Sequence, residues 1–302
     1  MKKVVITAAN GFMGRNLVDY LKRYFDIVCL VRNKKEDFDN VRYLIWDGKH
    51  IGDWKEELED AYCIINLAGR SVDCRYNDKN KQEIYDSRLK STEVLGEAIR
   101  SSVGKPKLWI NASSATIYKH SLDEPMTESD GVEGKGFSVD VCQKWEKIFF
   151  SYASSETRQV AIRTAIVLGN DGGALNPLVN LVKFGLGGKQ GSGEQMFSWI
   201  HIDDFCKSIL FILNHKELAG PINLAAPNPV KNVVLMKALR LAYNRGFGIP
   251  LPAGILKLGA RLIKTETELI LKSRFVLPEV LLKAGFEFEF ENLDKALEEL
   301  KQ

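Results

Sequence analysis

The segment Thr7-Ala8-Ala9-Asn10-Gly11-Phe12-Met13-Gly14 joins an apolar run at 4–6 to a segment with helical spacing at 14–24. It follows a Gly-x-x-Gly-x-x-Gly pattern in which Ala8 occupies the position of the first glycine. Such a turn lets the backbone approach a pyrophosphate, which the following helix holds through its free N–H groups and its dipole. A turn without a ligand has the same appearance, but the position at the start of a strand–helix unit favours a dinucleotide site.

Short apolar runs bounded by turn residues recur along the first two-thirds of the chain. They lie at 4–6, 27–31, 43–46, 63–67, 108–112 and 160–168. These runs are apolar throughout rather than alternating, as in strands that are buried on both faces of a parallel sheet. Segments with helical spacing separate them, at 14–24, 79–100 and 138–154. The pattern predicts an α/β fold, a Rossmann-type doubly wound parallel sheet.

The pattern loosens after about residue 170, where five glycines fall between 185 and 193. We therefore expect a nucleotide-binding Rossmann domain over 1–169, to which the segment around 200–224 returns. A smaller C-terminal α/β domain that binds the substrate is expected over most of 170–302, with a helical region at about 250–300.

Composition excludes several classes of function. The 302 residues are 45% hydrophobic and 27% charged, and the net charge of +3 is spread along the chain, so neither nucleic acid nor a membrane is an expected partner. The five cysteines contain no Cys-x-x-Cys pair, which argues against a disulfide framework or a zinc ribbon. The start of the chain does not resemble a signal peptide. We expect a cytoplasmic protein that acts on small molecules.

The end of the second apolar run indicates which nucleotide is bound. Proteins that prefer NAD place an acidic residue there for the ribose 2′-hydroxyl, whereas this run ends in Arg32, followed by Lys34 and Lys35. A guanidinium suits a 2′-phosphate because its planar fork can donate two charge-assisted hydrogen bonds. Arg32 therefore favours NADP over NAD, unless it only solvates the end of the strand.

Several ordered motifs resemble those of the extended short-chain dehydrogenases/reductases, the NAD(P)-dependent epimerase/dehydratase superfamily. They are the segments at 7–14, 66–69, 113–118 and 199–204. Further motifs are similar to those of an atypical subgroup, the epimerase-family proteins that carry a C-terminal domain of unknown function. These are the segments at 86–88, 167–173, 185–188, 198–204 and 273–278. The resemblance covers nearly the whole chain.

The resemblance implies a set of cofactor contacts. Around the pyrophosphate it places Ala8, Asn10, Gly11, Phe12 and Met13, with Arg32 at the 2′-phosphate and Asn66, Leu67 and Ala68 beside the riboses. Asp47 is either an adenine contact or part of an Asp-Gly turn. Glu83 is either functional or on a solvated helix face. Arg88 could face the cofactor or pin its helix.

The catalytic pattern of the family is incomplete. Ser114 occupies the position of the serine that orients the substrate, but Ser138 and Cys142 stand where the resemblance requires a tyrosine and a lysine. Neither replaces a phenolic acid activated by a fixed positive charge. Tyr118 is the closest substitute for the acid, four residues after Ser114, with a packing or substrate-shaping role as the alternative.

The substrate side departs from the sugar-nucleotide enzymes of the family. Ile166 and Phe197 replace the asparagine and arginine that grip a diphosphate, which disfavours a nucleotide sugar. His201 with Asp203 and Asp204 is interpreted as a structural corner, so no metal is expected. We expect an NADP-dependent oxidoreductase or epimerase-like enzyme for a small substrate. A non-catalytic NADP(H) sensor is the alternative, and a homodimer is possible.

Overall fold

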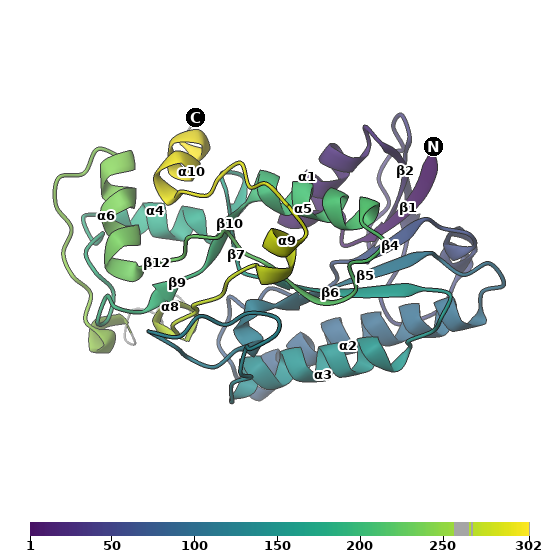
Figure 1. Ribbon diagram of the computed structural model, residues 1–302, viewed down its shortest axis with the longest axis horizontal. Helices are drawn as coiled ribbons and strands as arrows, with labels where there is room; N and C mark the ends of the chain where they lie inside the picture. The colour runs from purple at the N-terminus through teal and green to yellow at the C-terminus, as the bar shows by residue number, and fades with distance from the viewer. Residues whose placement is uncertain (257–265, 267, 302) are drawn as a thin grey trace.

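A computed structural model describes residues 1–256, 266 and 268–301 of the chain (Figure 1). Its centre is a seven-stranded sheet with the strand order β11-β6-β5-β4-β1-β2-β3, and every neighbouring pair is parallel. The strands are β1 (Lys2–Thr7), β2 (Phe25–Val31), β3 (Val41–Ile45), β4 (Cys63–Asn66), β5 (Leu108–Ser114), β6 (Arg158–Thr164) and β11 (Gly220–Leu224). The order reverses direction between β1 and β4, as in a doubly wound Rossmann sheet. The predicted fold class is confirmed.

Helices cover both faces of this sheet (Figure 1). Helices α1 (Phe12–Leu21) and α5 (Ile202–Asn214) pack side by side on one face, while α2 (Asp78–Ser101) and α3 (Phe137–Ser151) cover the other. Val4 and Ile6 of β1 belong to one buried apolar cluster, and Val5 belongs to another on the opposite face. The uninterrupted apolar strands of the sequence thus follow from burial on two sides.

A smaller region lies beyond the carboxyl ends of the strands (Figure 1). It contains a three-stranded sheet of β10 (Trp199–His201), β7 (Ile166–Gly169) and β8 (Gly172–Gly173), and a pair formed by β12 (Val230–Lys231) and β9 (Met196–Phe197). Its helices are α4 (Leu175–Lys183), α6 (Asn232–Ala242), α8 (Glu268–Leu271) and α10 (Leu293–Leu300), whereas α9 (Glu279–Lys283) packs against β11 of the large sheet. A separate apolar cluster holds α4, α6 and α10 together.

The two regions are interleaved along the sequence. The chain enters the smaller region after β6, returns to the large sheet as α5 and β11, and leaves it again for α6. The predicted division at residue 169 stays a prediction. Of the predicted helical region at about 250–300, residues 257–265 and 267 lie outside the described residues.

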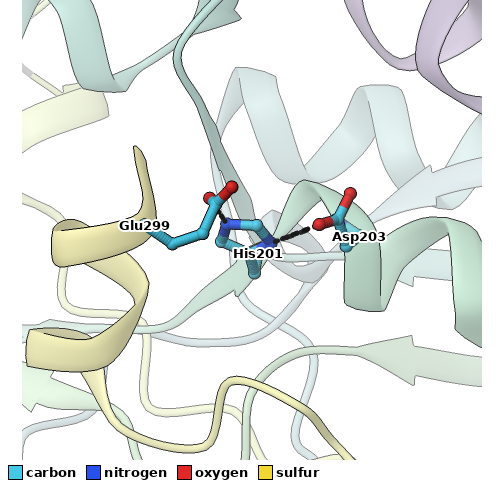
Figure 2. Close-up of side chains that lie close together, drawn as sticks. All are labelled: His201, Asp203 and Glu299. Atoms are coloured by element: carbon cyan, nitrogen blue, oxygen red, sulfur yellow. Dashed lines mark hydrogen bonds and ion pairs between the residues drawn. The ribbon is translucent and has the colours of Figure 1, made fainter. Parts of the chain in front are cut away.

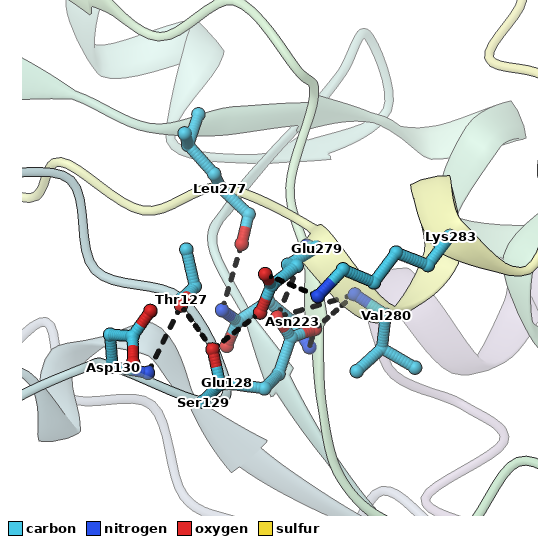
Figure 3. Close-up of polar contacts among 9 residues, drawn as sticks. All are labelled: Thr127, Glu128, Ser129, Asp130, Asn223, Leu277, Glu279, Val280 and Lys283. Carbon is cyan, nitrogen blue, oxygen red and sulfur yellow. Dashed lines mark hydrogen bonds and ion pairs between the residues drawn. The ribbon is translucent and has the colours of Figure 1, made fainter.

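The carboxylate of Glu128 attaches α9 to the edge of the large sheet (Figure 3). It accepts hydrogen bonds from the backbone N–H groups of Asn223 in β11, at 2.8 Å, and of Glu279, at 3.1 Å. Asn223 in turn donates through Nδ2 to the carbonyl oxygen of Leu277 at 2.9 Å. One carboxylate therefore satisfies backbone donors of a strand and of the first turn of a helix.

The described part of the chain contains no helix that is both long and apolar enough to cross a membrane. All five cysteines are free thiols, and Cys74 alone among them is not buried.

Candidate functional site

A cavity of about 360 Å³ lies at the carboxyl ends of the central strands. Met13 from the start of α1, Leu67 from the turn after β4, and Ser114 from the end of β5 contribute to its wall. Arg88 of α2 and Ile166 of β7 also line it. Ligands of doubly wound sheets bind at this position, since the strand order reverses here and leaves a crevice.

The turn before α1 has the geometry that a pyrophosphate requires. Ala8 has a φ of +52°, so it adopts the left-handed conformation that the first glycine of the pattern usually supplies. The N–H of Gly11 donates to the carbonyl oxygen of Ala8 at 2.9 Å and closes the turn. A Cβ atom on Gly14 would lie 2.4 Å from that oxygen, so only glycine allows this approach. No described side chain caps α1, which leaves its first N–H groups available to an anion.

The turn between β7 and β8 rests on the start of α1. A Cβ atom on Gly169 would lie 2.6 Å from the ring of Phe12, so the glycine makes room for this aromatic side chain. Arg15 and Asp171 form an ion pair at 2.9 Å, and Asn16 also donates to that carboxylate. These contacts explain why the motif at 167–173 contains an aspartate between glycines, which the sequence did not reveal.

Arg32 is exposed directly after β2, and no hydrogen bond or ion pair joins it to another described residue. Asp47, by contrast, accepts hydrogen bonds from the ring of His50 at 2.6 Å and from the backbone N–H groups of Lys49 and His50. The hydrogen bond from His50 and those from the backbone hold the pKa of Asp47 well below its ordinary value. The carboxylate of Asp47 thus stabilises a turn, and its contact with adenine stays a prediction.

Asn66 ends β4 and lies directly before the loop that carries Leu67 and Ala68. Its side chain is fully buried and accepts hydrogen bonds from Thr7 Oγ1 at 2.7 Å and from the N–H of Ala68 at 3.1 Å. Its Nδ2 atom donates to Asn111 at 2.7 Å. Asn66 therefore connects three neighbouring strand ends and shapes the loop that carries Leu67 and Ala68, and Leu67 itself reaches the cavity.

The motif at 86–88 on α2 fixes the same loop from the other side. Ser87 Oγ accepts a hydrogen bond from the N–H of Arg70 at 3.0 Å, and Arg88 Nη1 donates to the carbonyl oxygen of Arg70, also at 3.0 Å. Glu83 forms an ion pair with the side chain of Arg70 at 2.7 Å. Arg88 thus connects α2 with this loop, and it also lines the cavity, over the ring of Trp145. Its contact with the cofactor stays a prediction.

Ser114, Ser138 and Cys142 all line the cavity. Ser114 Oγ accepts a hydrogen bond from the N–H of Thr116 at 3.2 Å, while Ser138 Oγ donates to Glu268 at 3.0 Å. Burial raises the pKa of Cys142 to about 12, so its thiol stays protonated and is a poor nucleophile. The positions that the family uses for its tyrosine and lysine are thus part of the site but carry small side chains.

Tyr118 requires a correction. Its side chain is 2% exposed and is not part of the cavity wall. The hydroxyl donates to Asn223 Oδ1 at 2.9 Å and accepts from Arg163 Nη1 at 2.9 Å, so it is directed away from the cavity. Burial raises its pKa. The expectation that Tyr118 supplies a proton does not fit this geometry, and the alternative packing role does.

Two features of the site escaped the sequence analysis. Arg163 and Glu146 form a buried ion pair at 2.8 Å behind the strand ends, and Ser113 Oγ donates to the same carboxylate. Tyr76 lines the cavity from the segment before α2. The pair joins residues on different elements, and Tyr76 belongs to a segment without periodicity, so neither gave a signal.

His201 is the centre of the cluster with metal-ligand chemistry (Figure 2). Its Nδ1 atom accepts a hydrogen bond from the N–H of Asp203 at 3.2 Å and caps α5, and Nε2 lies 2.9 Å from a carboxylate oxygen of Glu299 in α10. The ring also stacks on Phe290 at 3.8 Å. Because both ring nitrogens have protein partners, the geometry fits a joint between α5 and α10.

Two family models match the sequence. The model of the NAD dependent epimerase/dehydratase family matches residues 4–135, and that of a domain of unknown function, DUF1731, matches residues 251–300. Among curated proteins, the epimerase family protein SH2119 of Staphylococcus haemolyticus is 34% identical over 304 aligned positions, which cover 99% of each chain.

Solved structures with similar folds include two above 25% identity. The human epimerase family protein SDR39U1 (isoform 2), whose crystal structure was determined with NADPH, has a TM-score of 0.85 and 28% identity, with 99% of each chain covered. The nucleoside-diphosphate sugar epimerase of Corynebacterium glutamicum has a TM-score of 0.79 and 30% identity, and the match covers 99% of this chain and 58% of that one.

Proposed function

Because this chain belongs to the NAD-dependent epimerase/dehydratase family, among its epimerase family proteins, we propose that it is an NADP-dependent oxidoreductase or epimerase-like enzyme. Its substrate is a small carbonyl or hydroxyl compound other than a nucleotide sugar. The observation that carries the proposal is the position of the cavity, which lies directly against the uncapped start of α1 and contains Ser114. When bound, the nicotinamide supplies or accepts the hydride.

The residues around the turn fit a dinucleotide. Five positions would surround the pyrophosphate: Ala8, Asn10, Gly11, Phe12 and Met13. The left-handed conformation of Ala8 and the absence of a side chain at Gly14 support this arrangement, because both let the backbone approach the phosphates. Leu67 and Ala68 would contact the riboses, on the loop that Asn66 shapes.

The preference for NADP rests on Arg32 and is supported by the human relative that was crystallised with NADPH. We expect Arg32→Glu to weaken NADPH binding far more than NADH binding, since it replaces a cation by an anion beside the 2′-phosphate. Arg100→Glu, in the last turn of α2, makes the same change in net charge and is the control. Equal losses for both nucleotides on Arg32→Glu would show that this arginine does not recognise the phosphate.

The apolar wall disfavours a sugar diphosphate. Ile166 lines the cavity where the sugar-nucleotide enzymes use an asparagine. Phe197 of β9 stands where they use an arginine; it has no hydrogen-bonding group and does not line the cavity. Ser114 is positioned to orient a substrate oxygen, because its hydroxyl proton is not donated to any described residue. The enzyme proposal is tested by NADPH oxidation with a panel of aldehydes, ketones and quinones.

A second candidate function is a non-catalytic NADP(H) sensor. It is favoured by Ser138 and Cys142, which occupy the catalytic positions of the family without its phenol or its ammonium group. A sensor binds NADPH tightly and oxidises none over the whole panel. Turnover of any panel member that depends on Ser114 excludes it.

A further inference from the structure

Helix α6 exposes apolar side chains where a surface helix normally carries polar ones. Its buried residues, among them Leu235 and Leu239, face α4 and α10 in one apolar cluster. The exposed residues of the helix form a single stripe that consists of Val233, Val234, Lys237 and Leu241. At 3.6 residues per turn these positions fall within about 100° of one another around the helix axis. The outer side of α6 is therefore mostly apolar.

The end of α4 and the loop after α6 extend this stripe at one end of the molecule (Figure 1). Arg240 of α6 donates to the carbonyl oxygen of Gly187 at 2.6 Å. The backbone of Ile249 donates to Gly185 at 2.8 Å and accepts from Gly188 at 3.1 Å. Four large apolar side chains are exposed on these joined segments: Phe184 (81%), Leu241 (66%), Phe247 (72%) and Ile249 (53%). The three segments thus form one surface with protruding apolar groups.

The charges that accompany these apolar side chains are positive. Three exposed cations on the same segments form no ion pair with a described residue, namely Lys183, Lys237 and Arg245. The segment 172–202 has one acidic residue, Glu194, which pairs with Lys231 at 2.7 Å. The segment 218–265 has none. The four apolar side chains and the three cations are called the α6 surface below, and this surface is complementary to an anion.

The charge of the α6 surface decides between its possible partners. Exposed apolar side chains that lie together mark a contact with protein or with a membrane. A second copy of the chain is disfavoured, because a two-fold contact would place the same cations against one another. Phe184 directly follows α4, and Phe247 stands between two glycines in the loop after α6. Protruding aromatic groups with cations beside them suit insertion into the headgroup region of a bilayer.

We propose that the protein binds the surface of an anionic lipid bilayer through the α6 surface. The apolar side chains enter the boundary between headgroups and acyl chains, and the cations pair with the anionic headgroups. The proposal goes beyond the proposed function, because it does not involve the cavity. It replaces the expectation that a membrane is not a partner, which rested on the net charge of +3. Nearly all the acidic residues that balance the cations lie outside segments 172–202 and 218–265.

Flotation of the full chain with lipid vesicles tests the proposal without any need for turnover. One set of vesicles contains phosphatidylcholine alone, and the other contains about one third phosphatidylserine in addition. We expect a partition coefficient at least about tenfold higher for the anionic vesicles. It should fall severalfold when sodium chloride rises from about 0.05 to about 0.5 M, because salt screens the attraction. Equal binding to both sets, or binding to neither, overturns the proposal.

The apolar part of the surface is tested by the double change Phe184→Ser with Phe247→Ser. It should lower the partition coefficient for anionic vesicles about tenfold or more. Because both side chains are exposed, the melting temperature and the dissociation constant of NADPH should stay unchanged. Val103→Ser with Val132→Ser, in the turn after α2 and in the segment before α3, changes exposed apolar residues elsewhere and is the control. Full vesicle binding by the variant with both phenylalanines replaced contradicts the insertion.

The charged part is tested by Lys237→Gln with Arg245→Gln. This pair should remove most of the preference for anionic vesicles. Arg23→Gln with Lys147→Gln removes two exposed cations outside the α6 surface and should leave most of the preference in place. Equal losses in both pairs would show that net charge rather than this surface attracts the protein, and would overturn the proposal. A dimer in analytical ultracentrifugation that Phe247→Ser dissociates, without vesicle binding, would assign the surface to a second copy instead.

Discussion

Arg163 of β6 holds the carboxylate of Glu146 of α3 in a two-point hydrogen bond, from Nε at 2.9 Å and from Nη2 at 2.8 Å. Both side chains are buried behind the end of the sheet. Burial alone would lower the pKa of Arg163, but its hydrogen bonds to Glu146 raise it above the ordinary value. The third guanidinium nitrogen donates to Tyr118, so one arginine connects α3 with the turn after β5.

Glu146→Leu should lower the free energy of unfolding by about 3–5 kcal/mol, because it leaves the guanidinium of Arg163 buried without an anion. Urea unfolding followed by circular dichroism measures the change. The double change Glu146→Leu with Arg163→Met should recover much of the loss, since it removes both charges. A single change that costs less than about 1 kcal/mol would show that water reaches this pair.

Tyr118→Phe should lower the free energy of unfolding by about 1–2 kcal/mol, since Asn223 and Arg163 each lose a hydrogen-bond partner. The dissociation constant of NADPH and any turnover should stay within about twofold of the unchanged protein, because the hydroxyl does not line the cavity. A large loss of turnover without a loss of stability would indicate that Tyr118 donates a proton in the reaction after all.

Ala8→Gly should be tolerated, whereas Gly14→Ala should destabilise the protein. Glycine at position 8 adopts a φ of +52° without strain, so stability should be unchanged or rise by about 1 kcal/mol. A methyl group at position 14 would lie 2.4 Å from the carbonyl oxygen of Ala8, which should cost more than about 2 kcal/mol and weaken NADPH binding. Thermal unfolding and fluorescence titration with NADPH check both. A tolerated Gly14→Ala would contradict the close approach of helix and turn.

Glu128→Gln should loosen α9. The amide has one acceptor oxygen in place of two, and its NH₂ group would face backbone donors of Asn223, Glu279 or Val280 (Figure 3). We expect a loss of about 1–3 kcal/mol, with faster hydrogen exchange at the start of α9 than elsewhere. Glu124→Gln, on the same segment but exposed, is the control. Uniform exchange rates in both variants would argue against this attachment.

Zinc or a chelator should leave the melting temperature unchanged within about 1 °C. The two ring nitrogens of His201 are used by the N–H of Asp203 and by Glu299, so a metal would have to break the cap of α5 (Figure 2). A rise in melting temperature that saturates at one equivalent of zinc would show a metal site here.

The sequence predicted best those features that depend on residues close together in the chain. Apolar runs predicted the buried strands, and the pattern at 7–14 predicted the turn before α1, in which Ala8 takes the left-handed conformation of the glycine that it replaces. Pairings between distant elements were not predictable in this way. Tyr118 is close to Ser114 in sequence but bonds to Asn223, which lies on a strand that is formed much later in the chain.

The same limit explains the other differences at the site. Glu83 and Arg88 both act on Arg70, which periodicity along α2 alone does not indicate. Asp47 illustrates the opposite case, because an Asp-Gly turn explains its contacts in full. Residues in segments without regular structure, such as Tyr76, can be recognised as part of the site only when the cavity that they line is known.

The position of β11 at the edge of the large sheet has a consequence for how the protein is made. Residues 165–219 separate β6 from this strand, and a ribosome that adds about 5–20 residues per second needs roughly 3–11 s to synthesise those 55 residues. During that time the backbone of β6 has an open edge that another nascent chain can pair with. Expression at lower temperature or with more holdase chaperone should therefore raise the soluble yield more than stabilising the finished protein does.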